Sequence, residues 1–490
     1  MSDAPVHLRR FLGRGDVLAV AFGAMVGWSW VVLAGEMIVQ AGAVGSILAF
    51  GAGAVMVWLV GLTYAELAAA LSRAGGELSY TFLALGPLGA FVCGWTLVLA
   101  YAAVCAFEAV ALPTVLGYLL PAFSTGEPLY AVAGWDVRQA WVAAGVAGAL
   151  VIGAVNYRGV RFAAFAQRLA VGGLLLVGLA FFVPGAARGD LANLAPAVTG
   201  WEGVLRVLIM TPFLYVGFDV IPQLAEEIAL PLRTIGRIIL LSIVMALGWY
   251  ALVQWTVGLT LPPDTLAERA LPTADAMSAV YGSPWGGRVL VLGGAVGILT
   301  SWNAFFLGAS RLLFAMARGG MLPAAFARLH PRYGSPAAVV VLLTAITAVA
   351  PFFGRPALVW LVDAGSLATV VAYLLVAVSF LVIRRRHPGL PRPYRVPAPA
   401  VVGWLAVAAT VFFVLLYLPG SPSALAWPEE WLIVLLWTGL GAGLAVGMRR
   451  RAAALGPGRQ ARLILGDQAH LVHSGAGPRP GPIPAGRSRG

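Results

Sequence analysis

The sequence has 490 residues, of which 60% are hydrophobic and only 11% are charged, and its formal net charge is +12. Soluble domains are about half apolar and about one quarter charged, so this composition excludes an ordinary soluble globule. The apolar residues also form long blocks, and a helix needs about 20 of them to cross the hydrocarbon core of a bilayer. We therefore predict an all-α integral membrane protein.

About twelve membrane-spanning helices are predicted along the chain. They cover residues 16–40, 43–71, 87–120, 138–155, 162–184, 202–224, 236–261, 286–317, 336–352, 356–383, 400–419 and 430–448. Residues 1–15 are predicted to be a cytoplasmic N-terminal segment, and residues 16–448 the membrane-spanning domain. Residues 449–490 are rich in Arg, Gly and Pro, which cannot bury a core, so we predict a disordered cytoplasmic tail.

All 32 basic residues are arginines, and their placement predicts the orientation. With the N-terminus in the cytoplasm, all but six of them lie at cytoplasmic ends of the predicted spans. The six are Arg138, Arg188, Arg206, Arg269, Arg288 and Arg355. Positive residues are retained inside during insertion, so both termini are expected in the cytoplasm. The clusters at 384–386 and 449–451 directly follow apolar spans, which predicts contact with anionic headgroups and argues against nucleic acid as a partner.

Two of the predicted spans are interrupted in a similar way. The first contains Gly23, Gly27 and Ser29, and the sixth contains Pro212 and Gly217. Interrupted helices at corresponding places, five spans apart, indicate an inverted-repeat protein with a binding site at the middle of the membrane. Ordinary helix packing at small residues is the alternative.

Three stretches carry a family resemblance in order and spacing. The first runs through Tyr64-Ala65-Glu66-Leu67, Gly75-Gly76-Glu77 and Gly86-Pro87 to Gly94-Trp95; the second is Phe213-Leu214-Tyr215-Val216-Gly217-Phe218-Asp219; the third is Ser310-Arg311-Leu312-Leu313-Phe314-Ala315-Met316-Ala317-Arg318. Together they resemble the amino acid, polyamine and organocation permease superfamily over residues 16 to about 450. The resemblance implies a 5+5 inverted-repeat (LeuT-like) fold with broken helices 1 and 6, plus two extra helices.

The resemblance also implies where a substrate binds. In that family the backbone exposed by the two breaks holds the carboxylate and ammonium of the substrate. The matching positions are Gly23, Ala24, Met25, Val26, Gly27, Trp28 and Ser29 in the first span, and Tyr215, Gly217, Phe218 and Asp219 in the sixth. Many relatives have Gly-Ser-Gly where this chain has Gly27-Trp28-Ser29. The indole of Trp28 either shapes the pocket or points into a neighbouring helix.

Several acids lie at membrane depth, where charge is costly, so each is a functional candidate. Glu108 has no basic residue nearby in sequence and can hold a substrate ammonium or a coupling proton; an internal hydrogen bond is the alternative. Glu66 is expected to pair with a loop arginine. Asp219 is expected to organise the break in the sixth span or to cap the second half of that helix. Glu36 is expected near the outer surface.

The coupling ion is left open between a proton and Na⁺, and exchange without a coupling ion is a further alternative. Some relatives use a lysine at the position of Leu174, but this chain contains no lysine. The hydroxyls of Thr300 and Ser301 are candidate Na⁺ ligands, although such hydroxyls also bond within their own helix. Glu108 is the candidate proton carrier, and no cofactor or metal is expected.

The resemblance and the acids together predict a secondary transporter that moves an amino acid across the cytoplasmic membrane by alternating access. A carboxylate-free amine is the alternative substrate, and a non-transporting nutrient sensor is a weaker alternative. No enzyme activity is expected, because no nucleophiles, histidines or metal ligands converge at depth; all five histidines fall in loops or tails. The oligomeric state is left open.

Overall fold

The computed structural model describes residues 12–71, 75–120, 123, 125–158, 163–225 and 228–474. The first part of the chain forms α1 (Arg14–Met25), α2 (Ser29–Val32), α3 (Ala34–Ala41), α4 (Ala43–Ala70) and α5 (Gly76–Leu119). It continues with the strands β1 (Tyr130–Val132) and β2 (Trp135–Val137), then α6 (Gln139–Arg158), α7 (Ala163–Arg188) and the 3-10 turn η2 (Leu191–Leu194).

The middle of the chain forms α8 (Trp201–Tyr215), α9 (Val220–Gln223), α10 (Leu232–Thr260), η4 (Pro263–Thr265), α11 (Pro272–Tyr281), α12 (Pro284–Arg318) and η5 (Ala324–Ala327). The last part forms α13 (Ala337–Val349), η6 (Ala350–Phe353), α14 (Ala357–Arg386), α15 (Pro399–Tyr417), α16 (Glu429–Leu455), α17 (Pro457–Leu465), η7 (Gly466–His470) and α18 (Leu471–Ser474). The two strands pair antiparallel as a short hairpin.

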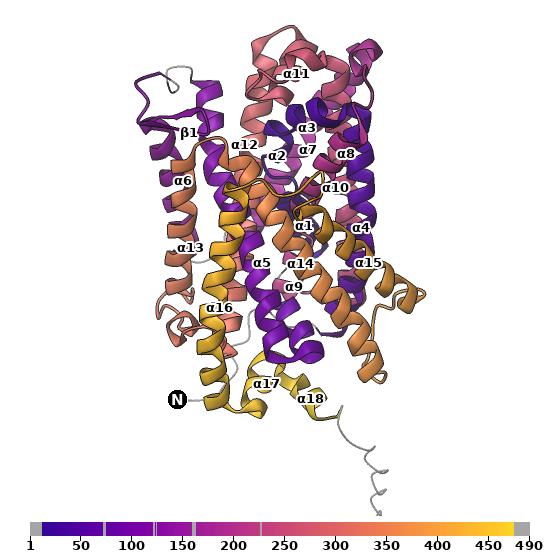
Figure 1. The fold of residues 1–490 in the computed structure, drawn as a ribbon, viewed down its shortest axis with the longest axis vertical. Helices are drawn as coiled ribbons and strands as arrows, with labels where there is room; N and C mark the ends of the chain where they lie inside the picture. Colours follow the sequence, from indigo (N-terminus) through magenta and orange to yellow (C-terminus); the bar gives the residue numbers. More distant parts are fainter. Residues whose placement is uncertain are drawn as a thin grey trace, which may run out of the picture.

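Within the described ranges, eleven helical segments are long and apolar enough to cross a membrane, and a shorter apolar helix covers Ala337–Phe353. This confirms the predicted all-α membrane fold. The long helices run side by side as one bundle, with the β1–β2 hairpin and α11 at one end and α17 and α18 at the other (Figure 1). The predicted start of the third span at residue 87 corresponds to a kink inside α5, where Gly86 adopts a φ of 76° and Pro87 follows.

The expectation of a disordered tail from residue 449 is wrong for the described part of that tail. Helix α16 continues to Leu455, and α17, η7 and α18 follow it to Ser474; residues 475–490 lie outside the described residues. Helix α17 buries Ala461, Ile464 and Leu465. It also donates a hydrogen bond from the Gln460 amide to the carbonyl oxygen of Gly319, at 2.8 Å. Composition missed this helix because only four of its positions need to be buried.

Candidate functional site

Helix α1 is broken at the place that its glycines predicted. It ends at Met25, Val26 departs from helical geometry (φ −106°, ψ 67°), and helix resumes at Ser29. The hydroxyl of Tyr250 on α10 donates to the carbonyl oxygen of Met25 at 2.7 Å and lies 3.0 Å from the hydroxyl of Ser29. Tyr250 therefore bridges the two sides of the break and satisfies one of the carbonyl groups that the break exposes.

The second break follows α8 and is organised by Asp219. Val216 is extended and Gly217 has a φ of 140°, which favours glycine. The carboxylate of Asp219 accepts a hydrogen bond from the Gly217 amide at 2.7 Å and one from the Tyr101 hydroxyl at 2.9 Å. The side chain is fully buried. Asp219 therefore shapes the loop, as one of the two sequence interpretations proposed.

The two breaks touch each other. A Cβ atom placed on Gly217 would lie 2.9 Å from the amide nitrogen of Met25 and 3.0 Å from the Cβ of Ala24. Real side chains do not approach that closely, so glycine is needed for both its conformation and its size. The ends of α1 and α8 consequently meet in the interior of the bundle.

Glu108 lies on α5 and faces the break in α1. A Cβ atom on Gly27 would collide with Glu108 Oε1 and would lie 2.8 Å from the hydroxyl of Ser301. The polar groups that act on this carboxyl are the Ser301 hydroxyl and the backbone amide of Trp28. Glu108 is 1% exposed, and its second oxygen, Oε2, has no hydrogen-bond partner among the residues that the structure describes. The structure thus brings three predicted site residues, Gly27, Glu108 and Ser301, into one cluster.

Thr300 reaches α1 from α12. Its hydroxyl donates to the carbonyl oxygen of Gly297 in its own helix at 3.0 Å, and it lies 3.4 Å from the carbonyl oxygen of Gly23. Gly297 also packs against the break, since a Cβ atom there would lie 2.8 Å from the carbonyl oxygen of Gly27. The small residues of α12 therefore allow the broken stretch of α1 to pack directly on that helix.

Trp28 points away from this cluster and packs between α5 and α12. The structure therefore agrees with the interpretation in which the indole points into a neighbouring helix. Its indole is completely buried and donates to the hydroxyl of Thr114 on α5 at 3.0 Å. The ring also packs on Gly294 of α12, where a Cβ atom would lie 2.7 Å from ring carbon Cζ3. The missing side chain at Gly294 provides the room that the indole fills.

Two other predicted residues lie apart from Glu108. The Tyr215 hydroxyl donates to the carbonyl oxygen of Phe50 at 3.1 Å, which ties α8 to α4. The Phe218 ring packs against Tyr64 and Tyr373, with centroid distances of 5.3 and 5.4 Å. These residues hold the second break in place.

Sequence reasoning missed Tyr250 and Tyr101, which supply the hydroxyls next to the two breaks. Tyr250 lies in an apolar helix without a motif. Tyr101 precedes Glu108 by seven residues, a spacing that places both on one face of α5 and is a signal that the sequence does contain. Leu174, at the position of the relatives' lysine, is buried.

Glu66 pairs with a loop arginine, Arg392, as predicted, and also with Arg384 in the last turn of α14. Its carboxylate accepts hydrogen bonds from Arg384 at 2.5 and 2.8 Å and from the Val396 amide at 2.9 Å, and it lies 3.1 Å from Arg392. Close to this network, burial lowers the pKa of His387, and the two cations Arg386 and Arg392 lower it further. Glu36 is exposed and accepts a hydrogen bond from Gln40, which agrees with its expected place near the surface.

Comparison with known proteins gives a consistent picture. The sequence model of the amino acid permease family matches residues 12–440. The chain is 26% identical to the branched-chain amino acid permease BcaP of Bacillus subtilis (strain 168), over 83% of this chain and 88% of the relative. It is 26% identical to the methylthioribose transporter of the same organism, over 89% and 92% of the two chains. It is 25% identical to the aspartate-proton symporter of that organism, over 81% and 78%.

The family match covers both helix breaks, Glu108 and the Thr300–Ser301 pair. Its relatives are transporters and not enzymes. The chain therefore belongs to the amino acid permease family and is a multi-pass membrane transporter of amino acids.

Proposed function

We propose that this protein is a secondary transporter that carries its amino acid across the cytoplasmic membrane by alternating access, with both termini in the cytoplasm. The distribution of arginines supports the orientation, because all but six fall at the predicted cytoplasmic ends. The two broken helices support the mechanism, because irregular backbone at membrane depth is tolerated where it lines a binding site.

The observation that carries the proposal is the meeting of Glu108 with the break in α1. In the described part of the chain, neither the Gly27 amide nor the Trp28 amide donates to a backbone carbonyl oxygen. Amides without a backbone acceptor at the start of a helical segment attract a carboxylate. The carboxyl group of Glu108 lies beside them, together with the Ser301 hydroxyl. The same amides would hold the carboxylate of an amino acid substrate.

This placement leads to a coupling mechanism. An ionised Glu108 competes with a substrate carboxylate for the same amides, whereas a protonated Glu108 does not. Uptake of a proton by Glu108 would therefore favour substrate binding, and release of the proton would favour substrate release. One relative is named as an aspartate-proton symporter, which supports a proton as the coupling ion. Na⁺ at Thr300 and Ser301 is the alternative, but the Thr300 hydroxyl is already bonded within its own helix.

A substrate without a carboxylate is the second candidate, and the position of Glu108 also favours it. A fixed carboxylate beside the α1 break would attract the ammonium group of an amine and would make a second carboxylate unnecessary. A relative named as a methylthioribose transporter shows that members of similar length differ in the chemistry of what they carry.

The experiment combines binding and transport. Purified protein is tested for thermal stabilisation by a panel of α-amino acids, by their carboxyl-blocked amides and by amines, because a ligand of the native state raises the melting temperature. The protein is then reconstituted in vesicles, and uptake is compared under a proton gradient and a sodium gradient. The same measurements are repeated with Glu108→Gln and Ser301→Ala.

We expect that only free α-amino acids stabilise the protein and that a proton gradient drives uptake. Glu108→Gln should abolish this proton-driven uptake, while exchange of substrate across the membrane persists. Stabilisation by the carboxyl-blocked compounds would assign the site to amines. Uptake that follows the sodium gradient and is lost in Ser301→Ala would replace the proton by Na⁺.

A further inference from the structure

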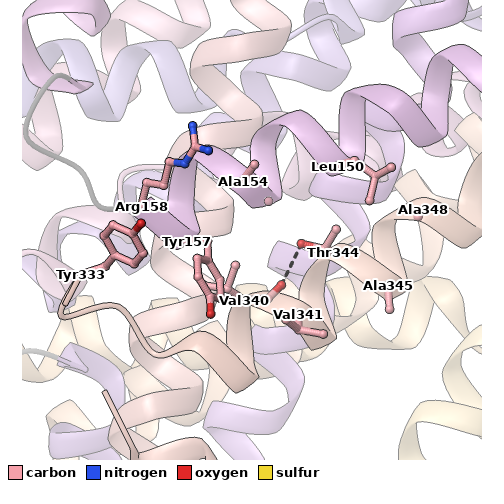
Figure 2. A pocket seen from close by; sticks show the side chains of 11 residues that line it. Leu150, Ala154, Tyr157, Arg158, Tyr333, Val340, Val341, Thr344, Ala345 and Ala348 are labelled. Atoms are coloured by element: carbon pink, nitrogen blue, oxygen red, sulfur yellow. Dashed lines mark hydrogen bonds between the residues drawn. The ribbon is translucent and has the colours of Figure 1, made fainter. Parts of the chain in front are cut away.

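A groove outside the transport site lies between α6 and α13, which pack together at the outer edge of the bundle (Figures 1 and 2). Its volume is about 590 Å³. Most of its walls are apolar and are formed by Leu150, Ala154, Val341, Ala345 and Ala348. Leu150 and Val341 are more than half exposed, so this face of the bundle contacts the hydrocarbon of the membrane.

Small residues create the groove. Gly153 of α6 faces Thr344 of α13 so closely that a Cβ atom on the glycine would collide with the threonine hydroxyl. That hydroxyl donates to the carbonyl oxygen of Val340 in its own helix at 2.8 Å, so it adds no unsatisfied polar group to the apolar wall (Figure 2). Ala154, Ala345 and Ala348 also line the groove, and their short side chains leave space in it.

One end of the groove is polar and positively charged. Figure 2 shows Arg158, Tyr157 and Tyr333 together at this end, away from Leu150 and Ala348. Arg158 is the last residue of α6 and is exposed, and no ion pair or hydrogen bond of its side chain occurs among the described residues. The Tyr157 ring packs against His330 and Tyr333, with centroid distances of 5.3 and 6.0 Å. The two tyrosines therefore form a fixed platform beside the exposed guanidinium.

The length of the groove matches one leaflet of a bilayer. Leu150 and Arg158 are eight residues apart on α6, which corresponds to about 12 Å along the helix axis. Half of the hydrocarbon core measures about 15 Å. An arginine at the interface therefore stands above an apolar channel that reaches toward the middle of the membrane.

We propose that this groove is a binding site for one anionic phospholipid. Its acyl chain lies along the apolar wall between α6 and α13, and its phosphate binds the guanidinium of Arg158 beside the hydroxyl of Tyr333 (Figure 2). A guanidinium suits a phosphate because its donors match the phosphate oxygens in a bidentate geometry. Basic pockets between membrane helices are places where lipid headgroups bind. The site is separate from Glu108 and does not depend on the transport mechanism.

The test uses the full chain in lipid nanodiscs of two compositions, phosphatidylcholine alone and phosphatidylcholine mixed with phosphatidylglycerol of the same acyl chains. Lipid that stays bound after extraction into detergent is counted by native mass spectrometry, and the melting temperature is measured on each sample. Arg158→Gln removes the headgroup contact, and Ala345→Phe fills the apolar wall. Arg206→Gln, at an exposed arginine of α8 outside the two arginine clusters, is the control for loss of one positive charge.

We expect wild type and Arg206→Gln to retain one phosphatidylglycerol and to melt at a higher temperature in its presence. Arg158→Gln and Ala345→Phe should retain it at least tenfold less and should lose the shift. Equal retention of phosphatidylglycerol by wild type and Arg158→Gln would overturn the proposal, as would equal retention of phosphatidylcholine. A dimer that Ala345→Phe disrupts, without preference for either lipid, would assign the groove to a second copy of the chain and would also overturn it.

Discussion

Replacing Glu66 by glutamine tests how the cytoplasmic side of the bundle is held together. The carboxylate is 1% exposed and binds Arg384, Arg392 and the Val396 amide, which come from more than 300 residues further along the chain. Glutamine keeps one acceptor oxygen but turns an NH₂ group toward arginine donors. The substitution therefore leaves two guanidinium groups without a charged partner.

The expected loss follows from the burial of the partners. Removing one member of a buried ion pair costs about 3–5 kcal/mol, because the remaining charge is buried without compensation. The side chain of Arg392 is 9% exposed, but that of Arg384 is 25% exposed and can recover water. We therefore expect the lower end of the range, about 3 kcal/mol. At about 2 °C per kcal/mol for a large chain, the melting temperature should fall by about 6 °C.

The melting temperature can be followed by intrinsic fluorescence, since the chain contains 16 tryptophans. Glu202→Gln is the matched control, because Glu202 pairs with Arg206 at 2.9 Å while both side chains are more than half exposed. Exposed pairs contribute about 0–1 kcal/mol, so this control should melt within about 2 °C of wild type.

Two results would refute this reasoning. The first is a melting temperature for Glu66→Gln that falls no further than that of Glu202→Gln. The second is strict additivity when Glu66→Gln is combined with Arg392→Gln, because residues that share one ion-pair network should show a coupling energy.

Three further predictions concern the break in α8, a buried histidine and Trp28. Gly217→Ala should abolish transport, because residue 217 has a φ of 140° and the added Cβ atom would collide with the backbone of α1. The control is Gly248→Ala on α10, where the Cβ atom would enter open space; uptake should be unchanged and stability equal or higher. Burial and two neighbouring arginines lower the pKa of His387, so protonation opposes folding, and stability should fall as the pH drops below 6.5. Melting curves between pH 7 and pH 5 should show this fall in wild type and a smaller one in His387→Gln. Trp28→Phe should lower stability by about 1 kcal/mol, because the hydrogen bond to Thr114 is lost. Substrate affinity in a binding titration should change less than about threefold. A large loss of affinity would place the indole in the substrate pocket.

The sequence by itself determined the membrane class, the all-helical fold and the positions of the two helix breaks. Long apolar blocks can be satisfied only by helices in a bilayer, and glycine and proline weaken a helix wherever they occur, so both features follow from local chemistry. The burial of Glu108 and the pairing of Glu66 with arginine were also predictable, because an acid at membrane depth requires either a function or a partner.

Only the tertiary structure decided which way the side chains point. In a soluble helix an apolar stripe marks the buried face, but a membrane helix is apolar on all sides, so its sequence does not show which side packs inward. For this reason Trp28 could be assigned to the pocket or to a neighbouring helix until Thr114 and Gly294 were seen around it. The partners of Glu66 and the docking of α17 against Gly319 depend on contacts between residues more than 100 positions apart, which no local pattern encodes.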